Sequence, residues 1–317
     1  MLMYYHALII SFLSFLSIAS YCVFFYSFPE FPTMASKKSI PSKKLISRHG
    51  SSSSFSLPSR DRFRDSESQK DFKENFYARA IYLKHQVVLS DFPNTPLPDA
   101  FSSRGWESLY EKPSRCPRMF IEKFYSNIHV INTFIPQFTM VFRGTHIVVT
   151  PDLITNVLHV LRIAHPNYLS HPRLRSISRD ELALWFCELL ISWGDTLNFT
   201  THDFAKGPRI FNMVMTFVLT PRSHYNTITE PRARFLYSLL EDLSIDFPSH
   251  IIVLMIDIYQ DTTTRDKLIF PSAITHILTY MHVPIPFAHL FPIMAAISQE
   301  SMWRSATQLV AKAKWPH

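Results

Sequence analysis

The sequence FTMVFRGTHIVVTPDLITNVL, residues 138–158, joins two elements with different side-chain periods. Two runs rich in β-branched and aromatic residues flank Arg143 and Gly144, and such runs favour strands. Gly144 can adopt the left-handed conformation that a tight turn requires, so we predict a β-hairpin near residues 138–149. Thr150 and Pro151 follow as an N-cap and a first helical residue, which predicts a helix over 151–160.

Helical signals dominate the surrounding sequence. Ser178 and Glu181 match the capping-box pattern, which predicts a helix over 179–191 that Gly194 ends. The run 248–258 is apolar nearly all round and predicts a buried central helix, too short to cross a bilayer. Further helical segments are predicted from Ser68, at 106–110, 117–128, 208–219, 229–240 and 271–281, and at 300–312. The fold class predicted is therefore mainly α with one β-hairpin.

An apolar segment, residues 1–33, precedes this domain. Residues 7–28 carry no charged side chain and as a helix would span roughly 33 Å, enough for a bilayer core. This predicts a transmembrane helix with its C-terminal side in the cytoplasm, because Lys37 and Lys38 follow it. Two alternatives stay open: a cleaved signal peptide, and an upstream extension of a protein that starts at Met34. The protein is thus expected in a membrane if residues 1–33 are translated, and otherwise as an intracellular soluble protein.

Residues 34–75 form a Ser/Lys/Arg-rich tail. They contain ten basic and five acidic residues, which accounts for most of the net charge of +7. Such a stretch buries too little apolar surface to offset its ordering entropy, so we predict a disordered tail. Its charge suggests weak attraction to nucleic acid or to an anionic surface. We place the folded domain at 76–283 and a variable segment at 284–317.

The composition excludes several kinds of site. Only 5 glycines are present, and no dinucleotide fingerprint or phosphate loop occurs. The 3 cysteines provide neither a disulfide framework nor a four-cysteine zinc site. Cys187 falls in a predicted buried helix, and Cys116 lies near two arginines in a loop. We interpret both thiols as structural rather than catalytic.

The remaining polar residues suggest no defined chemistry. His159, His165 and His171 recur every six residues, a spacing that does not match zinc-ligand pairs. Four aspartates near two helix ends offer a weak divalent-metal candidate: Asp242, Asp246, Asp257 and Asp261. A second set falls at helix starts and in one loop, where it would hold a phosphate or carboxylate, or else cap helices: Arg209, Arg222, Arg232, Arg234, His224 and Tyr225. We assign no catalytic, cofactor-binding or metal-binding residue, and Asn198 begins the one N-glycosylation sequon.

An ordered series of short motifs between Arg104 and Val283 resembles the putative plant transposon protein domain family, which is associated with plant retrotransposons and sometimes called envelope-like. The motifs are RGWE (104–107), FYSNI (124–128), VFRGT (141–145), VVTP (148–151), WGD (193–195), HYN (224–226), TEPRA (229–233) and IFPS (269–272). The resemblance implies origin in a mobile element and brings no catalytic residues. After Val283 the sequence departs from the pattern, which suggests a truncated or degenerate copy.

These observations lead to an expected function. No Asp-Asp, Asp-Thr-Gly or Asp-Ser-Gly sequence occurs, so the signatures of a reverse transcriptase and a retroviral-type protease are missing. We expect a non-enzymatic accessory or structural protein of a plant retrotransposon, with unknown partners. The alternatives are a membrane-anchored envelope-like protein, through residues 7–28, and a capsid-like nucleic-acid-binding protein, through residues 34–75.

Overall fold

The computed structural model describes residues 63–163, 171–187, 191–222, 225–261, 263, 266–286, 290–292, 294–298 and 300. The chain divides into two units, Met1–Phe55 and Ser56–His317, and all of the described residues belong to the second. The predicted transmembrane segment at 7–28 and nearly all of the predicted helix at 300–312 lie outside them. Among the described helices, none has the length and apolar composition to cross a membrane.

The predicted hairpin is confirmed. Strand β2 (Gln137–Phe142) pairs antiparallel with β3 (Thr145–Val149), and Phe142 faces Thr145 across the turn. The two turn residues, Arg143 and Gly144, have φ of 49° and 81°, as a two-residue type I′ turn requires. Alternate side chains of β2 are buried, so one face of the hairpin covers the core.

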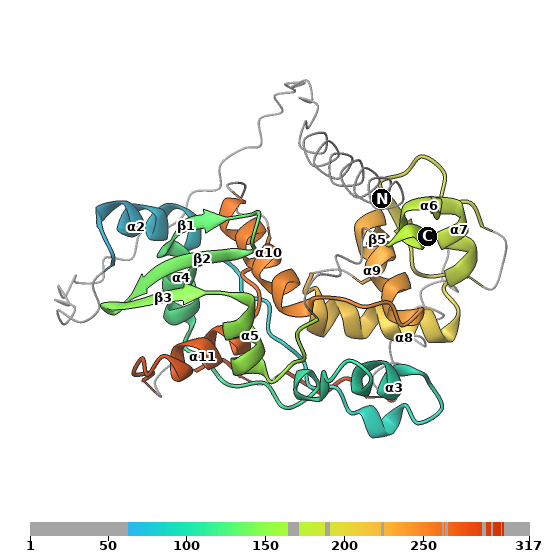
Figure 1. Cartoon of the computed structure of the whole chain (residues 1–317), viewed down its shortest axis with the longest axis horizontal. Coiled ribbons are helices and arrows are strands. Elements are labelled where there is room, and N and C mark those ends of the chain that lie inside the picture. Colours follow the sequence, from blue (N-terminus) through green and yellow to red (C-terminus); the bar gives the residue numbers. More distant parts are fainter. Residues whose placement is uncertain are drawn as a thin grey trace, which may run out of the picture. The chain divides into compact units, whose positions relative to one another are not determined.

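The expectation of a single hairpin is wrong in the number of strands. A third strand, β1 (Ile128–Asn132), pairs antiparallel with β2 and gives the sheet order β1-β2-β3 (Figure 1). A bulge at Val130, with φ of 43°, shifts the register and breaks the alternation that would have revealed this strand. A separate two-stranded sheet pairs β4 (Asn198–Thr200) with β5 (Thr227–Thr229), each too short to give a periodic signal.

Helices are the commonest elements of the described fold, so the mainly-α prediction is confirmed in part, since a three-stranded antiparallel sheet is also present. Within the described residues there are ten α-helices: α2 (Ser66–Asp71), α3 (Leu97–Ser102), α4 (Arg118–Ser126), α5 (Pro151–Leu158), α6 (Pro172–Ser176), α7 (Arg179–Phe186), α8 (Lys206–Val214), α9 (Glu230–Leu240), α10 (Phe247–Gln260) and α11 (Pro271–Tyr280). The Thr150 hydroxyl accepts a hydrogen bond from the Leu153 N–H, and Ser178 and Glu181 form the reciprocal capping box. The predicted helix starts at these two sites are therefore confirmed.

Helix α7 ends earlier than predicted. Its last residue is Phe186, because Cys187 adopts an extended conformation and forms an isolated antiparallel β-bridge with Phe204. The prediction of a helix to residue 191 is wrong for Cys187 and Ile191, while residues 188–190 lie outside the described part. Gly194, with φ of 64°, is separated from the helix and does not end it.

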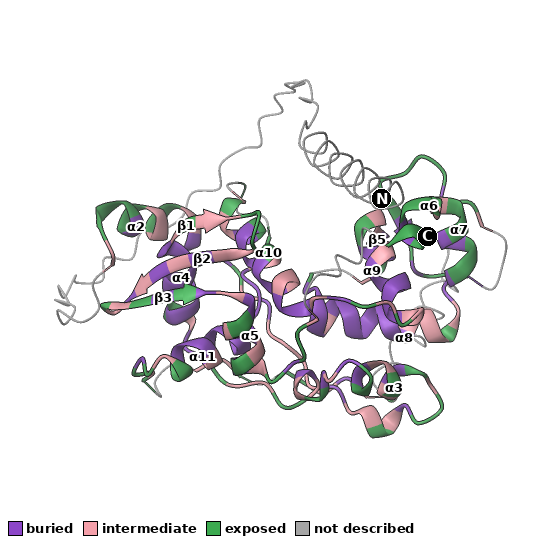
Figure 2. Cartoon of the chain, viewed as in Figure 1, coloured by how far each residue is buried: buried purple, intermediate pink, exposed green. Residues whose placement is uncertain are grey.

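Helix α10 occupies the centre of the core. Its residues Ile251, Ile252 and Met255 are buried, and the helix contacts both α5 and β2. Figure 2 shows the buried residues following α10, α8, α4 and α11. Val253 is 40% exposed, so α10 has a solvent-facing side that its nearly continuous apolar sequence did not predict.

The end of the predicted tail is ordered. Helix α2 and a π-helical segment, Phe72–Phe76, run together and contact α4. Asp65 caps α2 by accepting a hydrogen bond from the Ser68 N–H, while Phe76 is buried. The expected disorder is therefore wrong for residues 63–75, where the helix predicted from Ser68 is present and begins at Ser66. Residues 34–62 lie outside the described part. The prediction came from the average composition of a serine-rich stretch, and it overlooked the aromatic residues that pack in the last turns of that stretch.

Candidate functional site

Three of the four arginines singled out from the sequence bind backbone carbonyls of the fold itself. Arg232, only 8% exposed, donates to the Thr220 carbonyl at 2.7 Å and to the Thr216 hydroxyl at 2.6 Å. Arg234 donates to the carbonyls of Leu174 and Ile177 and pairs with Glu230 at 2.8 Å. Arg209 donates to the carbonyls of His202 and Phe204. They act as helix and loop caps, the second of the two interpretations above. Of the other members of this set, Arg222 is exposed, Tyr225 is partly exposed, and His224 lies outside the described residues.

Two further buried arginines were not singled out from the sequence. Arg104 donates to the carbonyls of Ser238, Leu239 and Leu243 at the end of α9 and forms an ion pair with Asp242 at 3.0 Å. Arg79 pairs with Asp261 at 2.7 Å and donates to the Asp266 carbonyl. Nothing in local sequence marks these residues, because their partners lie more than a hundred positions away in the chain.

The aspartates and histidines do not form a cluster. Asp242 and Asp261 pair with different arginines, and Asp246 caps α10 by accepting a hydrogen bond from the Ser249 N–H. His159 follows α5 and His171 precedes α6, while His165 lies outside the described residues. In the described part of the chain, no group of three His, Cys, Asp or Glu residues has metal-binding geometry.

Both described cysteines are buried. Burial raises the pKa of the Cys116 thiol to about 11, and it also raises the pKa of Cys187. The arginines next to Cys116 in the sequence therefore do not produce a reactive thiolate at neutral pH. These values agree with the interpretation of both thiols as structural.

A cavity lies where α5, α10 and α11 meet the segments around residues 82–84 and 108–112. It has a volume of about 280 Å³ and an apolar wall that includes Phe247, Ile251 and Phe270. Its polar residues are Tyr82, Lys84, Ser108, Glu111, Lys112, His159, Ser272 and His276. The concave shape, the apolar wall and the few polar groups match the general character of a small-molecule site.

A serine and a histidine meet beside this cavity. The Ser114 Oγ lies 2.6 Å from Nε2 of His276, and Nδ1 of His276 lies 3.2 Å from the Val157 carbonyl oxygen. A carbonyl only accepts hydrogen bonds, so Nδ1 carries the proton and Nε2 accepts the Ser114 O–H. The Ser114 N–H donates in turn to the Ser272 hydroxyl at 3.0 Å, which connects the pair to the first turn of α11.

Burial sets the protonation states in this region. Loss of solvation lowers the pKa of Lys84 to about 8, although nearby Glu111 favours the charged form. Burial also lowers the pKa of His276, and the positive charges of Lys84 and His159 add to this effect. At neutral pH, His276 is therefore neutral beside an ammonium group.

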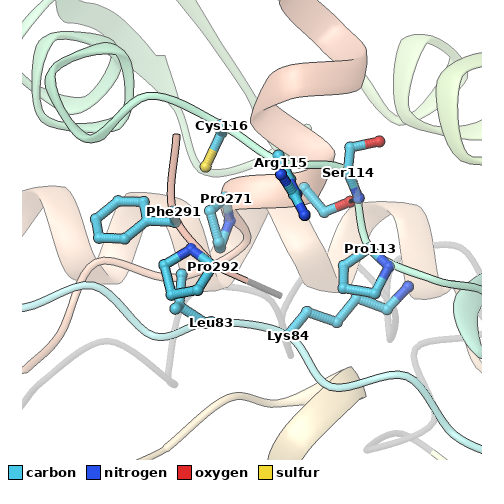
Figure 3. Close-up of a pocket in the computed structure, with 10 residues that line it drawn as sticks. Leu83, Lys84, Pro113, Ser114, Arg115, Cys116, Pro271, Phe291 and Pro292 are labelled. Atoms are coloured by element: carbon cyan, nitrogen blue, oxygen red, sulfur yellow. Dashed lines mark hydrogen bonds between the residues drawn. The ribbon is translucent and has the colours of Figure 1, made fainter. Parts of the chain in front are cut away.

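A second, smaller cavity lies on the other side of Lys84, Pro271 and Ser272, which line both cavities. It has a volume of about 20 Å³, the size of a water site. Figure 3 shows Phe291 and Pro292 at one side of it and Pro113 and Ser114 at the other, with Lys84 below. Lys84 thus lines both cavities together with the first residues of α11.

Two residues of the larger cavity have strained backbones. Phe270, which precedes α11, and His159, which follows α5, both have φ of 53°. Left-handed conformations are unfavourable for such bulky side chains, and they concentrate where the surrounding structure imposes them. The cavity could not be predicted from the sequence, because its residues come from six separate segments, although the family motif IFPS (269–272) contributes three of the residues.

The chain is a plant retrotransposon-related protein. The model of the family described as "putative plant retrotransposon-related domain" matches residues 102–284, which are more than half of the 317 residues. The chain belongs to that family. Neither a curated protein nor a solved structure matches it. The resemblance inferred from the short motifs is therefore confirmed at the level of the family.

Several of the motifs have clear structural roles. In RGWE, Arg104 caps α9 and Trp106 is 1% exposed, while Gly105 has φ of 60° and lies against Leu161, whose side chain would be 2.6 Å from an added Cβ. In VFRGT, the turn glycine closes the β2–β3 hairpin. These motifs accordingly stabilise the fold, and IFPS is the motif that reaches the cavity.

Proposed function

We propose that this retrotransposon-derived chain is a non-enzymatic accessory or structural protein of the element, which acts by binding rather than by catalysis. The observation that carries the proposal is the electrostatic setting of the Ser114–His276 pair, the arrangement most similar to a catalytic one in the described part of the chain. The buried arginines support the same proposal, because they bind carbonyls of the fold.

A catalytic serine needs a base that gains its proton. In serine hydrolases, a buried carboxylate stabilises the resulting imidazolium. His276 instead donates to the neutral carbonyl of Val157, and its pKa is lowered by burial and by the charge of Lys84. Protonated His276 would lie beside an ammonium group, and no described carboxylate is hydrogen-bonded to it, although the charge of Glu111 partly offsets the shift of its pKa. The pair is therefore poorly suited to general-base catalysis. We interpret it as a structural link between the segment around Ser114 and α11.

The two other functions suggested by the sequence depend on different residues. The envelope-like function requires the segment at 7–28, and the capsid-like function requires the tail at 34–75, most of which lies outside the described residues. No observation on the described residues favours either of them over the accessory role.

A serine-reactive probe tests the absence of catalysis. The full chain would be treated with a fluorophosphonate and analysed by peptide mass spectrometry, with Ser114→Ala and His276→Gln as matched variants. We expect no adduct on Ser114, because a hydroxyl without an effective base reacts slowly. An adduct on Ser114 that disappears in His276→Gln would contradict the proposal.

A second experiment tests the positive role. Particles from plant cells that express a marked copy of the element with a tagged chain would be separated on a density gradient. We expect the chain to sediment with the element RNA, and we expect Ser114→Ala to sediment in the same way. A chain that remains at the top of the gradient would argue against a structural role.

A further inference from the structure

We propose that the cavity between α5, α10 and α11 binds a small molecule with an anionic head group, a carboxylate or a phosphate, and an apolar body. This goes beyond the accessory role, since it assigns a ligand class to a site that the family match does not address. The inference depends on the cavity, on the distribution of charge around it and on a buried hydroxyl in its wall.

The polar end of the cavity favours an anion. Lys84 and Lys112 line it together with His159 and neutral His276, and Glu111 is the single carboxylate among the lining residues. Lys84 is partly buried and makes no ion pair or hydrogen bond with a described residue. An anion there would restore part of the stabilisation that the ammonium group loses on burial, because charge-assisted hydrogen bonds are among the strongest.

The start of α11 adds to this preference. Ser272 and Ala273, in its first turn, line the cavity, and α11 has no side-chain N-cap. Backbone N–H groups in a first helical turn have no partner within the helix and carry partial positive charge. The helix start and Lys84 therefore approach the same space from different parts of the chain.

An unsatisfied buried hydroxyl provides independent support. Tyr82 is 7% exposed and lines this cavity as well as a smaller one beside Asp257, and its hydroxyl has no hydrogen-bond partner among the described residues. Native structures rarely leave a buried polar group unpaired, and a bound ligand is one way to satisfy it. Burial raises the pKa of this hydroxyl, so it stays protonated and can donate to a ligand oxygen.

The apolar wall defines the other end of the ligand. Phe247 and Ile251 from α10, Val157 from α5 and Phe270 before α11 are buried and line the cavity. The volume of about 280 Å³ is close to the lower limit of known ligand sites, which suits a short chain or a single ring. A free inorganic anion would leave this wall without contacts.

Three ligands of equal chain length separate charge from hydrophobicity. Octanoate, octanol and octylammonium would be titrated into the full chain by calorimetry at pH 7, with octyl phosphate to compare the two head groups. We expect octanoate or octyl phosphate to bind at least about tenfold more tightly than octanol, and octylammonium to bind most weakly. Equal affinity for octanoate, octanol and octylammonium would overturn the proposal. So would a failure of both octanoate and octyl phosphate to bind the folded chain.

Variants locate the binding. Lys84→Met keeps the apolar stem and removes the charge, so the affinity for the anion should fall by about tenfold. Lys70→Met, on exposed α2, is the matched control and should bind as the unmodified chain does. Ala273→Leu places a larger side chain in the cavity and should also weaken anion binding. This second variant tests the proposal if circular dichroism shows that Lys84→Met does not fold. Unchanged anion affinity in folded Lys84→Met, or in folded Ala273→Leu, would place binding elsewhere and contradict the assignment.

Discussion

The Ser114 Oγ and the Nε2 of His276 lie 2.6 Å apart although 162 positions separate them in the sequence. Through this pair the loop before α4 is attached to the middle of α11, and through Nδ1 of His276 it is also attached to the end of α5. The contact fixes one border of the cavity for which we propose an anionic ligand. It therefore belongs to the framework of the site, and the predictions below test the rest of that framework.

The turn of the β2–β3 hairpin gives the first prediction. Gly144→Val should destabilise the domain by about 1–2 kcal/mol, because a β-branched residue is unfavourable in a left-handed conformation. Its φ is 81°, and no atom lies within 4 Å of an added Cβ, so the effect comes from the backbone alone. Gly207→Ala in α8, where φ is not positive and space is also open, is the control and should be neutral or stabilising. Chemical denaturation measures both, and equal stability of the two variants would contradict this explanation.

The core around α7 gives the second prediction. Phe186 is 0% exposed and its ring centroid lies 5.0 Å from that of Phe204. Phe186→Ala should reduce the free energy of unfolding by about 3–5 kcal/mol, as expected for removal of a buried aromatic ring. Leu184, in the same helix, is 51% exposed, and Leu184→Ala should change stability by less than about 0.5 kcal/mol. If the two losses were similar in urea titrations, α7 would not pack as the structure shows.

The buried guanidinium of Arg232 gives the third prediction. Arg232→Met should destabilise the domain by about 1–3 kcal/mol, because it leaves the Thr220 carbonyl without its donor. The loss is limited because burial already lowers the pKa of Arg232 to about 10, which reflects an unfavourable desolvation that the variant removes. Arg222→Met is the matched control from the same predicted set, and its exposed side chain predicts little change. Thermal unfolding of the two variants provides the comparison, and an unchanged midpoint for Arg232→Met would contradict the role of its hydrogen bonds.

The fourth prediction concerns pH and His250. Burial, together with the charge of Arg232, lowers the pKa of His250 to about 4, and its ring stacks on Phe235 with centroids 4.7 Å apart. The unfolded chain binds this proton near pH 6.5 and the folded chain only near pH 4, so stability is full above pH 6.5 and decreases as the pH falls between these values. The contribution is on the order of 1–3 kcal/mol.

His250→Gln tests this dependence. Its free energy of unfolding should be lower than that of the unmodified chain at pH 7 and should depend less on pH between 7 and 4. The slope of stability against pH distinguishes titration from lost packing, since lost packing shifts all pH values equally. Identical slopes for the two proteins would exclude His250 as the titrating group.

Several elements could be predicted from the sequence alone, because each depends on interactions between residues that are close together in the chain. Gly144 is compatible with the turn of a hairpin, Thr150 and Ser178 satisfy first-turn N–H groups, and prolines start or precede helices, all within a few residues of the element concerned. The ordered motifs also sufficed to indicate the family. Each of these inferences depends on conformational preferences or on contacts between residues close in the sequence, which a linear pattern records.

Only the tertiary structure decided the remaining features. Strand β1 exists because β2 offers it an edge, and α7 ends at Phe186 because Cys187 bridges to Phe204. Arg79 and Arg104 are buried because helix ends distant in the sequence present carbonyls to them. The cavity arises in the same way, from side chains that six separate segments bring together. Their partners are distant in the chain, so the free energies that determine these features come from contacts that exist only after the chain has folded.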